Sequence, residues 1–238
     1  FLRHTDSDTL YLVGDMIDGW RLKKNWYWPQ LHNDVVQKLL RKARKGTKLV
    51  YLPGNHDEFI RDFVGQTMGN ISLAEQVVHE TAKGERFLIL HGDQFDSVVK
   101  YARWLAFLGD KAYSLLLKIN VPINWVRRRL GFSYWSLSAY LKMKTKRAVN
   151  FISEFETALS REAARQDLDG VICGHIHTAE MKTHNGLLYM NDGDWVESCT
   201  ALVEDQDGNM HLLNWIEEIA HRAARDRALK ARAETKAA

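Results

Sequence analysis

Short runs of apolar or alternating residues, separated by polar segments that contain glycine, recur along this 238-residue sequence. Their length and their content of Val, Leu and Ile are typical of β-strands. Two longer segments, residues 31–45 and 151–166, carry apolar residues at helical spacing and predict amphipathic helices. The strands are predicted at residues 9–13, 48–52, 77–80, 86–90, 170–173, 187–190, 200–204 and 210–215.

The order of these elements predicts the fold class. Strands alternate with helices early in the chain and cluster near its end, which favours an α/β sandwich of mixed β-sheets flanked by helices. Ligand-binding residues of open α/β sheets collect at the carboxyl ends of the strands. The Ala- and Arg-rich segment 217–238 predicts a helical, partly disordered tail.

Composition is that of a globular protein, with 45% apolar and 26% charged residues. The two cysteines, Cys173 and Cys199, are too few for a disulfide framework, so we expect a reducing compartment. We find no signal peptide and no apolar run that could span a bilayer. These features predict a cytoplasmic protein, and peripheral binding to the inner membrane is the alternative location. The chain starts at Phe1, and we expect an upstream segment to be missing.

Charge is distributed unevenly, although the net charge is only +3. Residues 97–150 contain eleven basic residues and one acid, Asp110, so the rest of the chain has a net charge of −7. The same segment is rich in Trp, Leu and Phe at helical spacing. We therefore predict a basic, apolar helical cap at 97–150, inserted into a core formed by residues 1–96 and 151–216.

Four predicted strands end in glycine together with side chains that can bind metal ions. The motifs are Gly14-Asp15, Gly54-Asn55-His56-Asp57, His91-Gly92-Asp93 and Gly174-His175-Ile176-His177. Each alone has an ordinary explanation, because Gly-Asp is a common turn and Asn55 or Asp57 could cap a helix. Together they supply Asp, Asn and His without Cys, which suits a first-row divalent ion.

This ordered set resembles the calcineurin-like metallophosphoesterases, whose pattern is D-x-H, G-D-x-x-D, G-N-H-[DE], a later His and G-H-x-H. The last four elements are matched by Gly14–Asp18, Gly54–Asp57, His91 and Gly174–His177. The resemblance implies two divalent ions, about 3.5–4 Å apart, that activate water and clamp a phosphoryl group. We expect Mn²⁺, with Fe²⁺ or Zn²⁺ as alternatives.

The resemblance also implies the metal ligands. Asp15 would bridge the two ions. One site would be completed by Asn55, His91 and His175, and His177 would belong to the other. The first family element, D-x-H, is absent from these 238 residues. We therefore expect the chain as given to retain one metal site and to lack two ligands of the second.

Catalysis and substrate binding follow from the same resemblance. His56 would contact the phosphate or protonate the leaving group, with Asp57 orienting it. We also expect substrate contacts from Asp18 and Trp20, which lie in an aromatic and basic loop, although packing is the alternative role for the tryptophan. Further contacts are expected from the basic insertion, at Arg127, Arg128 and Arg129.

Within this family the chain resembles the UDP-2,3-diacylglucosamine diphosphatases of lipid A synthesis. The cues are His91-Gly92-Asp93 followed by a long helical insertion, and Asn191–Glu197 after G-H-x-H. In that group the insertion forms a cap that holds acyl chains. Apolar area and cations together suit a lipid with an anionic head group and a membrane surface. The alternative is a helical hairpin on the core whose basic side chains are merely solvated.

Other functions stay open at this stage. Many members of that group have Arg where His56 stands, so another phosphodiesterase or phosphatase, acting on phospholipid, nucleotide or nucleic acid, is the alternative enzyme. Nucleic acid is the less favoured partner because the basic insertion carries so many Leu and Trp residues. A catalytically impaired membrane-surface module is the alternative that is not an enzyme. The sequence makes no prediction of the oligomeric state.

Overall fold

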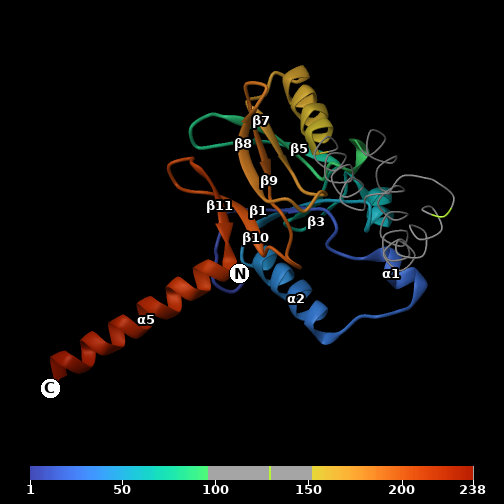
Figure 1. The fold of residues 1–238 in the computed structure, drawn as a ribbon. Coiled ribbons are helices and arrows are strands. Elements are labelled where there is room, and N and C mark those ends of the chain that lie inside the picture. Colours follow the sequence, from blue (N-terminus) through green and yellow to red (C-terminus); the bar gives the residue numbers. More distant parts are fainter. Residues whose placement is uncertain (96–128, 130–151, 238) are drawn as a thin grey trace. The chain divides into compact units, whose positions relative to one another are not determined.

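A computed structural model describes residues 1–95, 129 and 152–237 of the chain (Figure 1). The chain divides into two compact units, Phe1–Asp93 with Ser160–Ala238, and Gln94–Leu159. The predicted cap at 97–150, with Arg127 and Arg128, lies outside the described residues except for Arg129. Arg129 is helical and exposed.

The first sheet of the larger unit has four strands in the order β1-β2-β4-β3. β1, β2 and β4 are parallel, and β3 pairs antiparallel with β4. Thr9 lies opposite Lys48 and Val13 opposite Leu52, so β1 and β2 end at the same edge of the sheet. The strands are β1 (Thr9–Val13), β2 (Lys48–Leu52), β3 (Thr67–Met68) and β4 (Ile71–Leu73).

The second sheet has five strands in the order β5-β6-β7-β9-β8. Its central strands β6, β7 and β9 are parallel, and β5 and β8 are antiparallel edge strands. The sheets are therefore mixed, as predicted. The strands are β5 (Gln76–Glu80), β6 (Arg86–Leu90), β7 (Gly170–Cys173), β8 (Glu180–His184) and β9 (Leu187–Asn191). The hairpin of β10 (Thr200–Glu204) and β11 (Met210–Asn214) forms a separate two-stranded sheet.

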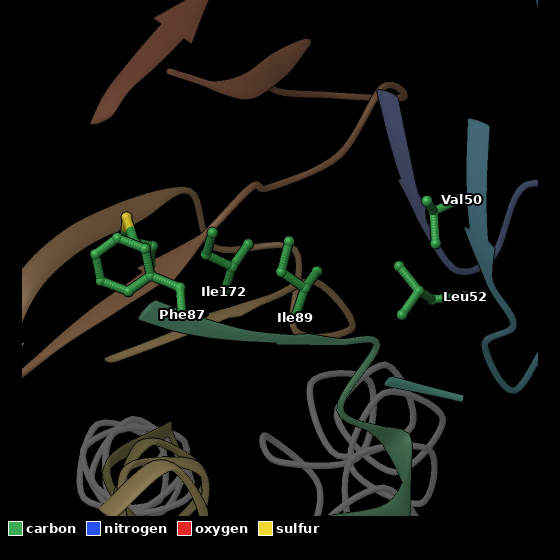
Figure 2. Packing of buried hydrophobic residues seen from close by; sticks show 6 residues of the cluster. Val50, Leu52, Phe87, Ile89 and Ile172 are labelled. Atoms are coloured by element: carbon green, nitrogen blue, oxygen red, sulfur yellow. The ribbon is translucent and has the colours of Figure 1, made fainter. Parts of the chain in front are cut away.

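The main hydrophobic core lies between the two large sheets. Val50 and Leu52 of β2 pack in one cluster with Phe87 and Ile89 of β6 and Ile172 of β7 (Figure 2). Successive residues of a strand point to opposite faces of the sheet. Leu49, which precedes Val50 in β2, therefore points to the outer face of the first sheet. Burial of these side chains from both sheets fixes the sandwich and holds the strand ends in place.

Helix α2 (Gln30–Arg44) covers the outer face of the first sheet. Its Leu39 and Ala43 pack on Leu49, together with partly buried residues of β1 and β4. A short helix α1 (Gly19–Lys24) precedes it in a segment for which a loop is predicted, and begins because Asp18 caps its first turn.

The remaining helical elements are two 3-10 turns, η1 (Glu58–Phe63) and η2 (Asp93–Phe95), a helix over residues 152–165, and α5 (Trp215–Ala237). Helix α5 begins at an aromatic cluster in which the ring centroid of Phe1 lies 5.0 Å from that of Trp195 and 5.6 Å from that of Trp215. Among the described residues, we find no helix whose length and apolar character would allow it to cross a membrane.

Candidate active site

Four strands from the two sheets end at one place and carry polar residues there. Asp15 follows β1, Asn55 follows β2, His91 follows β6 and His175 follows β7. Potential ligand atoms of Asp15, His91 and His175 all lie within 4.8 Å of one another. The two histidines are buried and the aspartate is half-buried. The sandwich therefore gathers ligand types that bind first-row divalent ions.

The imidazole of His91 is oriented by a backbone group. Its Nδ1 lies 3.0 Å from the carbonyl oxygen of Val13, to which Nδ1–H donates. Nε2 then faces Asn55 Oδ1 at 3.3 Å and Asp15 Oδ2 at 3.5 Å. In the neutral tautomer these three atoms are all acceptors, so the arrangement needs a proton or a cation among them. Backbone orientation of the second ring nitrogen is typical of metal-binding histidines.

The pKa shifts of Asp15 and His91 also fit a metal-binding site. Burial by itself raises the pKa of Asp15, but hydrogen bonding and charge from His91, with the backbone N–H of His56, outweigh burial and bring the pKa to about 2. Burial lowers the pKa of His91, and the bond and charge of Asp15 reverse this and raise it. Asp15 therefore stays ionised at neutral pH, which is the form in which a carboxylate binds a metal ion.

Backbone conformation at the ligand positions is strained. Asp15, His175 and His177 have φ angles of 53°, 67° and 53°. This left-handed region costs a residue other than glycine about 1–2 kcal/mol, and it recurs at functional sites. Gly54 leaves the space in which the ligands converge, because a Cβ there would lie 2.3 Å from Asp15 Oδ1 and 2.7 Å from His91 Nε2.

Asp57 is fully buried and joins the loops after β1 and β2. Its carboxylate accepts hydrogen bonds from the backbone N–H groups of Gly54, at 2.6 Å, and Met16, at 2.9 Å. The hydroxyl of Tyr51 donates a further bond to it. Among the hydrogen bonds of the described residues none joins the side chains of Asp57 and His56, so this carboxylate holds the loops rather than the imidazole.

The carboxylate beside His56 is that of Asp18. Its Oδ1 lies 3.2 Å from Nδ1 of His56, and it also accepts the backbone N–H of Arg21 at 3.0 Å as the cap of α1. The ring of Trp20 stacks on the imidazole, with centroids 4.3 Å apart and planes at 30°. The backbone N–H of His56 donates to Asp15 Oδ1 at 2.9 Å, which fixes this residue next to the ligand cluster. Asp18 and Trp20, predicted to contact substrate, thus both contact His56.

His177 is separate from this group. Its side chain is exposed, and it is not one of the three residues whose ligand atoms converge. Its assignment to a second metal ion stays a prediction.

Arg61, a residue that the sequence does not single out, ties two loops of the site together. The guanidinium of Arg61 donates from Nη2 to both carboxylate oxygens of Asp93, at 2.7 and 2.9 Å, and to the carbonyl of Pro53 at 3.2 Å. It thereby links the loop of Asn55 to that of His91. Asp93 belongs to a predicted motif, but its partner lies 32 residues away and carries no signal in the sequence.

Asp192 lies in the predicted motif Asn191–Glu197, but the sequence assigns it no role. It follows β9 and lies beside Gly174, where an added Cβ would be 3.2 Å from its Oδ1 and 3.7 Å from Nδ1 of His91. Burial raises the pKa of Asp192 to about 7. A carboxyl group that titrates near neutral pH therefore lies close to His91.

The sequence profile of the calcineurin-like phosphoesterase family matches residues 1–179, which is most of the chain. This chain belongs to the calcineurin-like phosphoesterase family. The predicted enzyme class and fold are thereby confirmed: the protein is a phosphoester hydrolase with mixed sheets and flanking helices. Members of this family use divalent metal ions, and the ionised Asp15, the oriented His91 and the space at Gly54 fit such an ion.

Two relatives of this calcineurin-like phosphoesterase have the same name. The UDP-2,3-diacylglucosamine hydrolase of Neisseria gonorrhoeae is 26% identical over 202 residues, 84% of this chain and 81% of its own. The protein of the same name from Chromohalobacter salexigens is 30% identical over 173 residues, 72% of this chain and 67% of its own. Among solved structures, a Vps29 mutant from Entamoeba histolytica matches 90% of this chain and 85% of its own, with 13% identity and a TM-score of 0.39.

Proposed function

We propose that this phosphoesterase hydrolyses the pyrophosphate bond of a lipid-linked nucleotide of the UDP-2,3-diacylglucosamine type. The observation that carries the proposal is the convergence of Asp15, His91 and His175 beside His56. The shared name of the relatives supports the substrate class.

The metal-binding part of the proposal rests on Asp15, Asn55, His91 and His175. Their mixture of oxygen and nitrogen ligands favours Mn²⁺, with Fe²⁺ or Zn²⁺ as alternatives. When bound, such an ion polarises a phosphoryl oxygen and lowers the pKa of water. A second ion would need ligands in addition to His177 that these 238 residues do not supply in the family pattern.

The protein groups provide orientation and proton transfer. Asp18 holds Nδ1–H of His56, so Nε2 is the nitrogen that faces the substrate and can give a proton to the leaving phosphate. The Nδ2 of Asn55 is buried and has no acceptor among the described residues, so a phosphoryl oxygen would satisfy it. Both groups would stabilise the negative charge that grows on the oxygens during cleavage.

Phosphorus NMR of the products tests the substrate. The full-length protein is given UDP-2,3-diacylglucosamine with Mn²⁺, and in parallel a simple aryl phosphodiester. We expect the coupled pyrophosphate signals to be replaced by those of two monophosphates. Turnover of the diester without turnover of the nucleotide would support the alternative of another phosphodiesterase, favoured by the intact His56. Metal binding without turnover of either would support a non-catalytic membrane module.

A further inference from the structure

The segment 19–31, here called the aromatic–basic loop, exposes large apolar side chains. It comprises α1, the connection to α2 and the first two residues of α2 (Figure 1). Trp26 is 77% exposed, Leu31 is 74% exposed and Tyr27 is 52% exposed. A tryptophan left in water forgoes the stabilisation that burial of its large ring would give. Three large apolar side chains exposed within six positions therefore indicate a surface that binds a partner.

All charged side chains of the aromatic–basic loop are basic. Arg21, Lys23 and Lys24 are exposed, and residues 19–31 contain no Asp or Glu. The guanidinium of Arg21 lies 5.1 Å from the ring centroid of Tyr27, so cation and aromatic ring are held together.

The loop is fixed from within, which leaves Trp26 directed outward. Trp28 uses its Nε1–H to bond Asn33 Oδ1 at 2.7 Å, and its ring contacts that of His32 at 5.3 Å. Trp26 makes no such hydrogen bond or ring contact with the described residues, and its side chain is exposed.

We propose that the aromatic–basic loop binds the surface of an anionic membrane. Trp and Tyr prefer the level of the lipid head groups, and clustered Lys and Arg are attracted to anionic lipids. A second copy of the chain is disfavoured as the occupant, because a symmetric contact through this surface would bring like charges together.

The location of the loop connects this surface to the site. Trp20 belongs to the loop and stacks on His56, so the loop begins at the proposed catalytic imidazole. In this respect the inference rests on the proposed function: a lipid-linked substrate would reach His56 directly from the bilayer surface. Binding to the membrane itself requires only the exposed aromatic and basic side chains.

Cosedimentation with vesicles tests the inference, using the full chain without substrate. We expect binding to equimolar phosphatidylcholine and phosphatidylglycerol, little binding to phosphatidylcholine alone, and loss of binding at high salt. Lys23→Gln/Lys24→Gln should weaken binding about 30-fold, since each cation near an anionic surface contributes about fivefold. Trp26→Ser should weaken it about tenfold.

Matched variants elsewhere provide the controls. Lys45→Gln/Lys48→Gln removes the same charge from the end of α2 and the start of β2, and Val196→Ser alters a side chain that is 87% exposed outside the loop. Loop variants that bind like the unsubstituted protein, or controls that weaken binding as much, would overturn the inference. Self-association that Trp26→Ser abolishes in ultracentrifugation would assign the surface to a second copy instead. Because no turnover is measured, failure of the proposed hydrolysis would leave these results unaffected.

Discussion

The carboxylate of Asp57 sits where the loops after β1 and β2 meet, and removing it should be costly. Asp57→Ala would leave the buried N–H of Gly54 and the hydroxyl of Tyr51 without their acceptor. We expect the free energy of unfolding to fall by about 3–5 kcal/mol, as when one partner of a buried charged network is removed. Urea denaturation measures it. A loss of less than about 1 kcal/mol would contradict the loop-holding role.

His56 and its partner Asp18 should affect turnover rather than metal content. His56→Ala should lower kcat by about a hundredfold or more, the range of general acid–base catalysis. Asp18→Asn should lower kcat less, because the imidazole stays but loses its orienting charge. Steady-state kinetics with an aryl phosphodiester and elemental analysis of bound metal distinguish the effects.

The control for these two variants is Asp62→Asn, an exposed carboxylate in η1. It should leave kcat unchanged. If His56→Ala instead lost its metal while Asp18→Asn kept full turnover, His56 would be a ligand and not a proton donor.

Sequence patterns place the ligand-bearing positions well and the side-chain partners poorly. Asp15 and Asn55 could be expected together, and likewise His91 and His175, because the parallel strands of each pair end at one edge of a sheet. The partner of His56 could not be predicted, since Asp57 is adjacent in sequence but turns into the buried loop junction. Asp18, 38 residues away, reaches the imidazole only because it caps α1.

At the scale of elements, the ion pair of Arg61 in η1 with Asp93 in η2 should tune metal affinity. Arg61→Gln would release the two loops that carry Asn55 and His91. Outer partners of metal ligands typically change affinity by about 10–100-fold. We expect a weakening of about tenfold in calorimetric titration with Mn²⁺, partly restored in Arg61→Lys.

A matched ion pair is offered by Arg165, which bonds Glu162 at 2.6 Å on an exposed helix surface. Arg165→Gln should leave Mn²⁺ affinity unchanged, because exposed pairs contribute little. Equal affinity in the Arg61 and Arg165 variants would remove the case for a positioning role of Arg61.

Central elements are more predictable than edge elements. β2, β6 and β7 are apolar because both of their faces are covered, and their positions are evident from the sequence. β8 has the sequence Glu-Met-Lys-Thr-His, whose polar residues reflect an edge position, and the only signal for it is the Asn185-Gly186 turn that follows. Helix α1 is also missed, since its six residues are too few for a hydrophobic period.

At the scale of the whole molecule, the sandwich itself follows from element order, but its pairing does not. The order β5-β6-β7-β9-β8 pairs Phe87 of β6 with Gly170 of β7, far apart in the sequence, and no local pattern specifies such a ladder. The consequence is functional: Asp15 and Asn55 come from one sheet, and His91 and His175 from the other.

Because the ligands come from both sheets, metal binding should stabilise the whole sandwich and not one loop. At free Mn²⁺ about a hundredfold above its Kd, the folded state should gain about 2.7 kcal/mol over the protein in EDTA. For a chain of this size the gain corresponds to an increase in Tm of about 5–10 °C. His175→Ala should remove the increase, whereas His221→Ala, on the exposed surface of α5, should retain it.

The same samples determine how many ions bind. Since the ligands that converge among the described residues are Asp15, Asn55, His91 and His175, we expect one tightly held ion per chain in elemental analysis, and a Tm that follows a single binding isotherm. Two tightly held ions per chain would contradict this, and would mean that His177 and other residues of this chain complete a second site without the D-x-H element. An unchanged Tm in Mn²⁺ would contradict metal binding by residues of both sheets, because an ion bound in this way stabilises the folded state against unfolding.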